Sequence, residues 1–496
     1  MEEIHSRLSI EKVDEVYIKV RCEPHIAAEL SEFFTFEVPG ARFSPAYRNR
    51  VWDGKIRLYN KKTGKVYGGL LAYIHKFAEQ NELEVVQGKD VYSSTKIDMK
   101  DVEGFCKSLK PQSQGKDIEI RDYQIQAIYQ CLKRHKLLLL SPTASGKSLI
   151  IYSIVRFHQM ANRKTLIIVP TTSLVEQMYS DFADYGWEVD KYCHRIYHGY
   201  DKDVVKDVVI STWQSLATLD KDYFQQFDCV IGDEAHNFKA KSLTTIMTAL
   251  NNAKYRIGTT GTLDGTKTHK LVLEGLFGTV YRATSTKKLI DKNQLSKLTI
   301  KCLVLKHNEK DRRQIKGATY LEEMEHIVGK RVRNNFIRNL ALSTCTGNTL
   351  ILFQYVEKHG KPLYDEIVEK ANDGRKVFFV YGGTETSDRE RIRAITEKLD
   401  NTIIVASYGT FSTGINIRNL HNIIFSSPSK SPIRILQSIG RGLRLGEQKQ
   451  SATVYDIADD LSIGSYKNFT LDHFAKRVEI YNEEQFNYEI HNVELK

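Results

Sequence analysis

The stretch LLLLSPTASGKSLI, residues 137–150, decides the fold of this chain. Its four leucines are typical of a short buried strand, the small residues after them of a loop, and the apolar run 149–155 of a helix. This order places Gly146, Lys147 and Ser148 at the helix start, where unpaired backbone N–H groups favour an anion. We interpret the strand, loop and helix as the phosphate-binding unit of an α/β protein.

These residue types suit a nucleoside triphosphate, and we expect ATP and Mg²⁺ as cofactors. Lys147 would reach the β- and γ-phosphates, and the Ser148 hydroxyl would ligate Mg²⁺. The loop departs from the pattern GxxxxGK[ST] at its first position, which is Ser141. An ordinary helix start with a solvated lysine is the alternative. The residues that we expect to contact the nucleotide here are Thr143, Ala144, Ser145, Gly146, Lys147 and Ser148.

Two adjacent acids end a later apolar run in CVIGDEAH, residues 229–236. Asp233 would hold Mg²⁺, usually through a water, because this cation keeps several waters. Glu234 could then orient and deprotonate the attacking water. Acidic pairs at strand ends are common, so this pair is informative only because it follows the phosphate loop in the same sheet. We assign His236 a coupling role, and a simple capping residue is the alternative.

The segment IRDYQ, residues 120–124, precedes a helical pattern just upstream of the phosphate loop. The amide of Gln124 can both donate to and accept from the edge of adenine. We therefore predict that Arg121 and Gln124 contribute to nucleotide binding, although a glutamine by itself could equally be a surface residue.

A second set of charges lies in QSIGRGLR, residues 437–444. Arg441 and Arg444 are three residues apart and would share one face of a helix. With Gln437, they could act as catalytic groups that stabilise charge on the γ-phosphate. Binding of carboxylates or of a nucleic-acid backbone is the alternative. Because these arginines lie far along the chain from Lys147, the first role requires ATP in a cleft between two sheets that closes and opens.

Short apolar strands alternate with helical stretches through most of the chain, which predicts parallel sheets with helices on both faces. The simplest organisation is two such units in tandem. The predicted strands are 137–140, 165–169, 208–211, 229–232, 255–259, 349–353, 377–381, 402–406, 423–425 and 453–457. We expect an N-terminal domain (1–110), a first sheet domain (111–284) that begins with the linker PQSQGKD, a basic helical connection (285–340), a second sheet domain (341–461) and a helical C-terminal segment (462–496).

Composition excludes several classes of protein. The chain is 41% hydrophobic and 27% charged, which is typical of a folded chain and not of a disordered one. No apolar run approaches the roughly 20 residues of a membrane-spanning helix, and the acidic N-terminus does not resemble a secretory signal. Seven cysteines without a CxxC pair argue against a disulfide framework or a zinc site and for a reducing compartment.

Charge is distributed unevenly near the N-terminus, in a small unit whose pattern mixes strands and helices. Residues 1–41 carry four Lys or Arg and nine Asp or Glu, whereas residues 42–65 carry eight basic residues and one acid. The basic segment would attract duplex phosphates without reading bases. Phe43, Tyr47, Trp52 and Tyr59 interleave with its charges and could stack on bases, although Trp52 and Tyr59 fit a core better than an exposed platform. The nucleic-acid contacts predicted here are Arg42, Arg48, Arg50, Trp52 and Lys55.

The ordered set of motifs resembles that of superfamily 2 helicases over about residues 118–460. The N-terminal segment 33–58 and the FNYEI tail are similar to the UvsW-like helicases of T-even bacteriophages. The motifs that carry the resemblance are 121–124, 142–148, VPTTSLVEQ (169–177), STWQ (211–214), DEAH (233–236), TGT (260–262), LILF (350–353), SYGTFSTGIN (407–416) and 437–444. In the phosphate loop, Ala144 replaces a glycine of the family pattern, which leaves the backbone less free.

The resemblance implies α/β architecture with two tandem RecA-like parallel-sheet domains, a small α+β N-terminal domain and a short helical C-terminal segment. It implies an ATP-dependent DNA helicase that moves 3′ to 5′ and acts on Holliday junctions, forks and R-loops in recombination, repair and replication. We expect a monomer in the cytoplasm of the bacterial host, with phage recombination or single-strand-binding proteins as candidate partners and branched, single-stranded, duplex or hybrid nucleic acid as substrate.

The motifs also imply roles for individual residues. Thr260 and Thr262 would couple hydrolysis to the grip on DNA. Tyr408 stands where the family often has threonine, which leaves open which hydroxyl holds the strand there. The residues implied to contact the phosphates of one strand are Pro170, Thr171, Thr212 and Gln214 in the first sheet domain and Phe353, Ser407, Thr410 and Gly414 in the second.

Three alternatives remain open from the sequence. The motor motifs do not separate a DNA helicase from an RNA helicase, because phosphate contacts dominate both. An ATP-switched binding or annealing protein without unwinding would carry the same motifs. A motor subunit of a restriction or repair complex is disfavoured by the lack of a recognisable nuclease carboxylate cluster.

Overall fold

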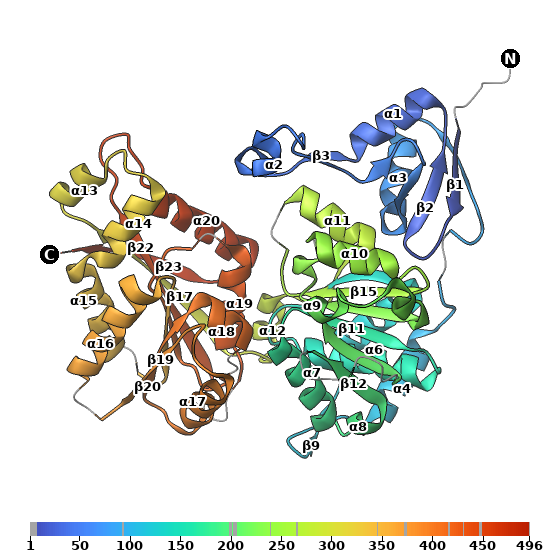
Figure 1. Cartoon of the computed structure of the whole chain (residues 1–496). Helices are drawn as coiled ribbons and strands as arrows, with labels where there is room; N and C mark the ends of the chain where they lie inside the picture. The colour runs from blue at the N-terminus through green and yellow to red at the C-terminus, as the bar shows by residue number, and fades with distance from the viewer. Residues whose placement is uncertain are drawn as a thin grey trace. The chain divides into compact units, whose positions relative to one another are not determined.

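The computed structural model describes residues 7–91, 94–197, 201, 206–238, 240–263, 266–344, 346–371, 374–414, 417–429, 431–445 and 449–495. They form two compact units, one of residues 1–141 with 146–283 and the other of residues 142–145 with 284–496. Within the described residues, each unit contains one seven-stranded parallel sheet with helices on its faces (Figure 1). The predicted fold class is confirmed. No helix among these residues is long and apolar enough to cross a membrane. The described cysteines are free, and Cys345 lies outside the described residues.

The first sheet has the strand order β12-β13-β11-β14-β15-β10-β16. The five strands predicted from the sequence in this region are confirmed; β12 and β16 are short edge strands that were not predicted. The strands are β10 (Lys136–Leu140), β11 (Thr165–Val169), β12 (Cys193–Ile196), β13 (Val208–Thr212), β14 (Cys229–Asp233), β15 (Tyr255–Thr260) and β16 (Val280–Arg282). The helices are α4 (Met99–Leu109), α5 (Asp122–Arg134), α6 (Lys147–Met160), α7 (Thr172–Asp184), α8 (Val189–Tyr192), α9 (Trp213–Leu216), α10 (Lys241–Ala249) and α11 (Lys267–Phe277).

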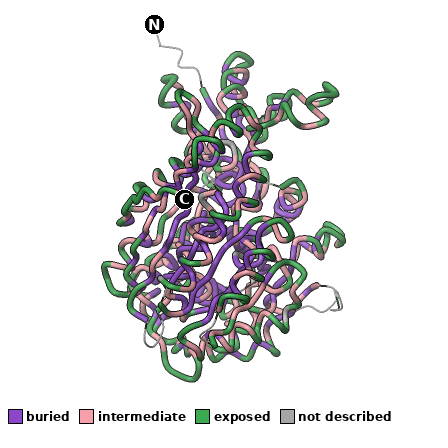
Figure 2. The backbone as a smooth tube through the Cα atoms, turned by 90° about the vertical axis from the view of Figure 1, so that its left-hand side faces the viewer, coloured by how far each residue is buried: buried purple, intermediate pink, exposed green. Residues whose placement is uncertain are grey.

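The continuous apolar strands follow from burial on both sheet faces (Figure 2). Successive side chains point to opposite faces. Thus Leu138 joins the core beneath α10 and α11, whereas Leu139 joins the core beneath α5, α6 and α7. Gly232 and Gly258 are paired on β14 and β15, and a Cβ on either would lie within 2.8 Å of the Phe277 ring. Glycine is therefore required where this ring packs flat on the sheet.

Within the described residues, the N-terminal domain has a five-stranded sheet, ordered β5-β6-β2-β1-β7, a separate two-stranded sheet of β3 and β4, and three α-helices. Leu58 separates two short strands, because β4 pairs with β3 while β5 joins the main sheet. Its elements are β1 (Arg7–Lys12), β2 (Tyr17–Arg21), α1 (Pro24–Phe33), β3 (Thr35–Glu37), α2 (Pro45–Arg48), β4 (Lys55–Arg57), β5 (Tyr59–Asn60), β6 (Lys65–Tyr67), α3 (Leu71–Gln80) and β7 (Glu84–Gln87). We call residues 35–57 the arm, because β3 and α2 project from this domain (Figure 1).

The N-terminal domain packs on α11 and β10 of the first sheet domain. A Cβ on Gly69 would lie 2.0 Å from the carbonyl oxygen of Glu274, so only glycine allows this approach. The Tyr73 hydroxyl donates to the Glu274 carboxylate at 2.6 Å, and Glu15 pairs with Lys136 at 3.5 Å. Apolar residues of both domains belong to one continuous core. The two domains therefore form one unit.

The expected linker 111–117 is instead a small hairpin of β8 (Gln112–Ser113) and β9 (Lys116–Asp117). Gln114 and Gly115 between these strands both have positive φ, which permits the tight turn. Helix α4, just before the hairpin, packs against α5 and α6 and contributes Val102 and Cys106 to their core. Polar composition indicated a turn correctly, but it did not indicate that the flanking residues pair.

The second sheet has the order β19-β20-β18-β21-β22-β17-β23, and the five strands predicted in this region are confirmed. Its strands are β17 (Lys297–Lys306), β18 (Thr349–Phe353), β19 (Lys376–Val380), β20 (Thr402–Ser407), β21 (Asn422–Phe425), β22 (Ser451–Asp460) and β23 (Tyr488–Glu494). Its helices are α12 (Thr286–Asp291), α13 (Glu309–Ile315), α14 (Tyr320–Gly329), α15 (Arg331–Asn339), α16 (Lys361–Lys370), α17 (Thr386–Lys398), α18 (Tyr408–Gly414), α19 (Pro432–Gly442) and α20 (Phe469–Glu483).

Two strands of this sheet, β17 and β23, were not predicted. The segment 285–340 was expected to be helical, but β17 lies within it and pairs with β22 over ten residues. Its lysines stand on partly exposed positions between buried apolar ones, so the segment resembled a basic connection. The C-terminal segment contains the expected helix, α20, and then adds β23, which pairs with β17 at the sheet edge.

A buried ion pair attaches α20 to the second sheet. Arg477 and Asp456 are both buried, and the guanidinium donates to both carboxylate oxygens at 2.8–3.0 Å. Arg477 also donates to the carbonyl of Ser429, and the Tyr481 hydroxyl donates to Asp456 at 2.8 Å. The hydrogen bonds around both charges offset much of their desolvation.

Replacing Arg477 with methionine should leave the Asp456 carboxylate buried without its counter-charge. We expect a loss of about 3–5 kcal/mol in the free energy of unfolding, measured by denaturant titration. The matched control is the double variant Arg477→Met, Asp456→Leu, which removes both charges and should lose much less. Equal losses in the single and double variants would contradict this assignment.

Candidate nucleotide-binding site

The phosphate loop connects β10 to α6 at the carboxyl edge of the first sheet. Gly146 has φ +76°, and Ala144 has φ +66°, so an alanine adopts the left-handed conformation that glycine accepts without cost. The backbone N–H of Ser141 donates to the carbonyl of Thr260 at 2.9 Å, which joins the loop to the end of β15. Ser145 is fully buried, and Thr143 is half-buried. The alanine that stands at position 144 in place of the family's glycine is therefore held in a strained backbone conformation.

Lys147 lies between the two acids predicted to be catalytic. Its Nζ is 2.8 Å from Asp233 Oδ1 and 2.8 Å from Glu234 Oε1. Burial opposes the charged ammonium, but the two carboxylates outweigh it and raise the pKa of Lys147 above its usual value. The Thr259 hydroxyl also donates to Asp233 at 2.7 Å and fixes its orientation. Ser148 follows Lys147 in the first turn of α6.

Gln124 lies directly against the phosphate loop. It is only 3% exposed, and a Cβ on Gly146 would lie 2.4 Å from its Nε2. Its side-chain oxygen accepts from the backbone N–H of Arg121 at 2.8 Å and closes a capping box at the start of α5. The Arg121 guanidinium donates to the Tyr123 hydroxyl at 3.3 Å. With its oxygen engaged in this way, Gln124 presents chiefly its amide nitrogen to the loop.

A short chain of hydrogen bonds connects the acids to the end of β15. The Thr260 hydroxyl donates to the carbonyl of Thr262 at 2.9 Å. Nδ1 of His236 is 3.0 Å from the same hydroxyl and 3.4 Å from Glu234 Oε2. Because the Thr260 proton is committed to Thr262, we assign the Nδ1 proton to His236, which donates to Thr260. The three residues predicted to couple the motor motifs are therefore in contact.

The predicted strand-contacting residues of the first unit lie at the ends of two paired strands. Val169 and Thr212 are in register on β11 and β13. Thr171 and Thr212 are N-caps, whose hydroxyls accept from the backbone N–H groups of Leu174 and Ser215. A hydroxyl that accepts can still donate its own proton, so both remain competent to bind a phosphate. Pro170 is half-buried and Gln214 is exposed at the same edge.

In the second unit, Ser407 and Thr410 are together, and Phe353 is a core residue. The Ser407 hydroxyl donates to Thr410 Oγ1 at 2.8 Å at the end of β20. The Phe353 side chain is fully buried and stacks on Phe379, so the expected contact with a phosphate could come only from its backbone. Gly414 ends α18, and residues 415–416 of this motif lie outside the described residues.

Tyr408 lies in the core of the second unit. Its side chain is buried, and its hydroxyl donates to the carbonyl of Ser427 at 3.0 Å. Among the side chains that the structure describes here, Ser407 and Thr410 carry the neighbouring hydroxyls.

Arg441 lies on α19, but Arg444 does not. The helix ends at Gly442, so the expected shared helical face is replaced by a helix end and a following turn. The guanidinium carbon of Arg441 is 5.6 Å from the centroid of the Phe411 ring, and Gln437 is half-buried one turn earlier.

Lys449 holds this turn and was not predicted from the sequence. It is 2% exposed, and its Nζ donates to the carbonyls of Gly442 and, at 3.1 Å, Arg444. Burial lowers its pKa to about 7. Its role depends entirely on the fold, because a lysine after a turn carries no pattern of its own.

Most basic residues of the arm are exposed to solvent, whereas Lys55 is half-buried. Arg42, Arg48 and Arg50 are exposed, whereas Arg57 pairs with Asp53. Phe43 is 64% exposed beneath the Arg42 guanidinium.

Trp52 is less exposed than Phe43 and so less suited to the expected contact with nucleic acid. The indole is half-buried, and its N–H donates to the carbonyl of Lys55 at 2.9 Å, so Trp52 supports the arm. Tyr59 is buried in the core of the domain. Phe43 is thus the better exposed aromatic for stacking.

Family models match three parts of the chain. Residues 8–87 match the model for the N-terminal domain of the DNA helicase UvsW, residues 117–265 the model for the res subunit of type III restriction enzymes, and residues 332–446 the helicase conserved C-terminal domain.

Individual relatives agree with these models. The ATP-dependent DNA helicase uvsW of Enterobacteria phage T4 is 34% identical over 97% of this chain and 98% of its own length. The DNA 3′-5′ translocase XPB2 of Sulfurisphaera tokodaii is 28% identical over 40% of this chain and 43% of its length. The crystal structure of T4 UvsW aligns over 99% of this chain and 100% of its own, with a TM-score of 0.54 and 31% identity.

Replacing Ala144 with glycine should relieve the left-handed backbone strain at the phosphate loop. We expect the free energy of unfolding to rise by about 0.5–1 kcal/mol, measured by denaturant titration. The control is Ala183→Gly at an exposed position on α7, where glycine should lower the free energy of unfolding by about 0.5–1 kcal/mol. A loss at Ala144 as large as at Ala183 would show that the loop is not strained.

Proposed function

The chain belongs to the UvsW family of ATP-dependent DNA helicases, and on this basis we propose that it moves 3′ to 5′ along DNA and remodels Holliday junctions, forks and R-loops. The observation that carries the proposal is the convergence of Lys147, Asp233 and Glu234 at one edge of the first sheet. By likeness to the phage relative, its place of action would be the bacterial host, in recombination, repair and replication.

The site has the donors that a nucleotide and Mg²⁺ require. The Ser148 hydroxyl and the Asp233 carboxylate are oxygen ligands of the kind that Mg²⁺ prefers. When bound, Mg²⁺ would neutralise charge on the β- and γ-phosphates. Lys147 would leave the two carboxylates for the phosphates, and the charge it now balances would be taken up by the metal.

Glu234 is the candidate base for hydrolysis. Once Lys147 contacts phosphate, the Glu234 carboxylate is available to orient a water and accept its proton. His236 lies beside it and connects it to Thr260 and Thr262. We propose that this chain of contacts passes the state of the nucleotide to the end of β15.

The second unit would complete the motor. We propose that Arg441 and Arg444, with Gln437 nearby, stabilise charge on the γ-phosphate when the two units close on ATP. Hydrolysis would remove that charge and release them. The result is a cycle of closing and opening driven by ATP.

The grip on DNA would come from hydroxyls and backbone amides. Thr171, Thr212 and Ser407 lie at or just after strand ends, and Thr410 and Gly414 lie on the helix α18 that follows β20; we propose that all five contact phosphates. Such contacts position a strand and carry no sequence information, which fits an enzyme that moves along DNA. The arm would add contacts to duplex phosphates near a branch.

Hydrolysis gives the direct test of the catalytic assignments. Glu234→Gln should reduce ATP turnover at least about 100-fold while leaving nucleotide binding within a few-fold, because it removes the base and keeps the shape. Lys147→Ala should lose both ATP turnover and nucleotide binding. Both are measured by steady-state turnover and by titration of a fluorescent ATP analogue, and near wild-type turnover in Glu234→Gln would contradict the assignment.

Turnover in the presence of different nucleic acids tests the substrate class. Single-stranded, duplex, forked, four-way, RNA and RNA–DNA hybrid substrates should be compared side by side with a strand-displacement assay. Stronger stimulation by RNA than by branched DNA would favour an RNA helicase, and turnover without displacement an ATP-switched annealing protein.

The arm gives a separate prediction for DNA binding. Replacing Arg42, Arg48 and Arg50 with alanine should weaken forked-DNA binding and reduce the slope of log affinity against log salt by up to about 3. The control replaces Lys100, Lys107 and Lys110, three exposed lysines on and after α4, with alanine. Equal slopes for the two triple variants, measured by fluorescence anisotropy, would remove the arm from the DNA contacts.

A further inference from the structure

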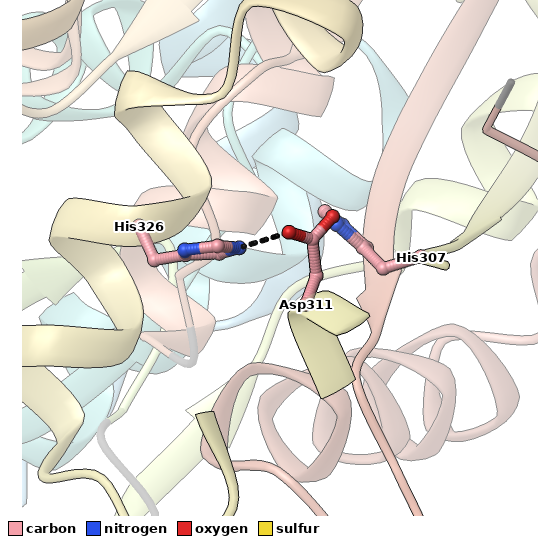
Figure 3. A group of neighbouring side chains, drawn as sticks. All are labelled: His307, Asp311 and His326. Atoms are coloured by element: carbon pink, nitrogen blue, oxygen red, sulfur yellow. Dashed lines mark ion pairs between the residues drawn. The ribbon is translucent and has the colours of Figure 1, made fainter. Parts of the chain in front are cut away.

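We propose that His307, Asp311 and His326 bind one divalent transition-metal ion, best matched by Zn²⁺, which joins two helices of the second unit to its sheet. One ligand atom from each residue lies within 4.8 Å of the other two. His307 directly follows β17, Asp311 lies on α13 and His326 on α14. In Figure 3, the His326 ring points at the Asp311 carboxylate, with His307 close behind it.

His307 has the environment of a metal-binding histidine. Its Nε2 is 2.9 Å from Asp459 Oδ1, and its ring is 1% exposed. If Nε2 carries the proton, Nδ1 offers a lone pair, and it has no hydrogen-bond partner among the residues that the structure describes. A carboxylate that orients the far nitrogen of a histidine is the usual second partner of a zinc ligand.

Asp459 is held in the ionised form that this arrangement requires. The Arg333 guanidinium donates to both of its oxygens at 2.8–2.9 Å. The tautomer of His307 is therefore determined by residues outside the cluster.

His326 and Asp311 face one another but are too far apart to form a hydrogen bond. The distance from Nε2 to Oδ1 is 3.8 Å, beyond the range of hydrogen bonds, and this nitrogen is buried with no partner within the described part of the chain. A tetrahedral Zn²⁺ at about 2.1 Å from each ligand needs the ligand atoms about 3.4 Å apart, so the distances between them would shorten by at most about 1.4 Å.

Lys330 gives the cluster a competing cation. Its Nζ is 2.7 Å from Asp311 and balances that buried carboxylate. A bound metal would share Asp311 with this ammonium, which should weaken metal binding. Removing the ammonium should therefore strengthen it.

The surrounding packing explains what the ion would contribute. The apolar cluster between α13 and α14 consists, among the described residues, of Ile315, Ile327 and Leu461, with Ala318 beside them. Two nitrogen ligands and one carboxylate suit Zn²⁺ better than Mg²⁺ or Ca²⁺, which prefer oxygen. Three protein ligands leave a fourth position for water. We assign the site a structural role because its ligands come from the end of β17, from α13 and from α14, so that the ion would tie these three elements together.

The test measures zinc itself. The full chain is stripped with a chelator and titrated with Zn²⁺ by calorimetry, with bound metal counted by elemental analysis. We expect one tightly bound zinc per chain and a rise in the unfolding temperature. His326→Gln should weaken binding at least about 100-fold and abolish that rise, because it removes a ligand from a half-buried position. Lys330→Met should tighten binding, and His491→Gln, an exposed histidine elsewhere, should leave it unchanged.

Two results would overturn the proposal. One is the loss of the expected difference: either the wild-type chain binds no zinc at micromolar concentration, or His326→Gln binds as many zinc ions per chain as the wild type. The other is weaker zinc binding in Lys330→Met. In either case the cluster would be two separate polar pairs, His307 with Asp459 and Asp311 with Lys330. Because ATP turnover is not the readout, failure here would leave the helicase proposal unaffected.

Discussion

The contact of one ammonium with two carboxylates at the carboxyl edge of the first sheet is the constraint on which the site depends. Lys147 can reach Asp233 and Glu234 because β10, β15 and β14 are adjacent, parallel and in register. Parallel strands end at the same edge, so residues far apart in sequence meet there. Two acids this close would repel one another without a cation between them. Lys147 thus stabilises the site before nucleotide arrives and is the group that must move when it does.

Buried charge has a different use in the second unit. Arg477 with Asp456, and Arg333 with Asp459, attach α20 and α15 to strand β22, and each carboxylate accepts several hydrogen bonds. Pairs of this kind add little net stability over apolar packing, but they are costly to break and favour one arrangement of helices on the sheet. Asp459 also orients His307, so the same residue connects the core of the sheet to the candidate metal cluster.

Prediction from the sequence succeeded where a local pattern is sufficient. Ten strands of the two sheets were predicted because continuous apolar runs between turn residues are typical of buried parallel strands. It failed for β17 and β23, whose lysines and polar residues lie on partly exposed positions, and for the hairpin at 112–117. For Phe353, the sequence did not indicate that the ring packs inward on Phe379, so the predicted phosphate contact would come from its backbone. Side-chain direction at the end of a strand depends on the helices above it, which a linear pattern does not contain.

The sequence by itself determined the order of motifs, and with it the class of fold and the identity of the charged residues, because spacing and residue type are local properties. Only the tertiary structure decided that Ala144 is strained, that Tyr408 is core, that Gln124 contacts the phosphate loop, and that Lys449 holds the turn after α19. It alone placed His307, Asp311 and His326 together, since they come from three elements with no motif between them. The reason is physical: burial, backbone strain and the meeting of distant side chains are set by packing.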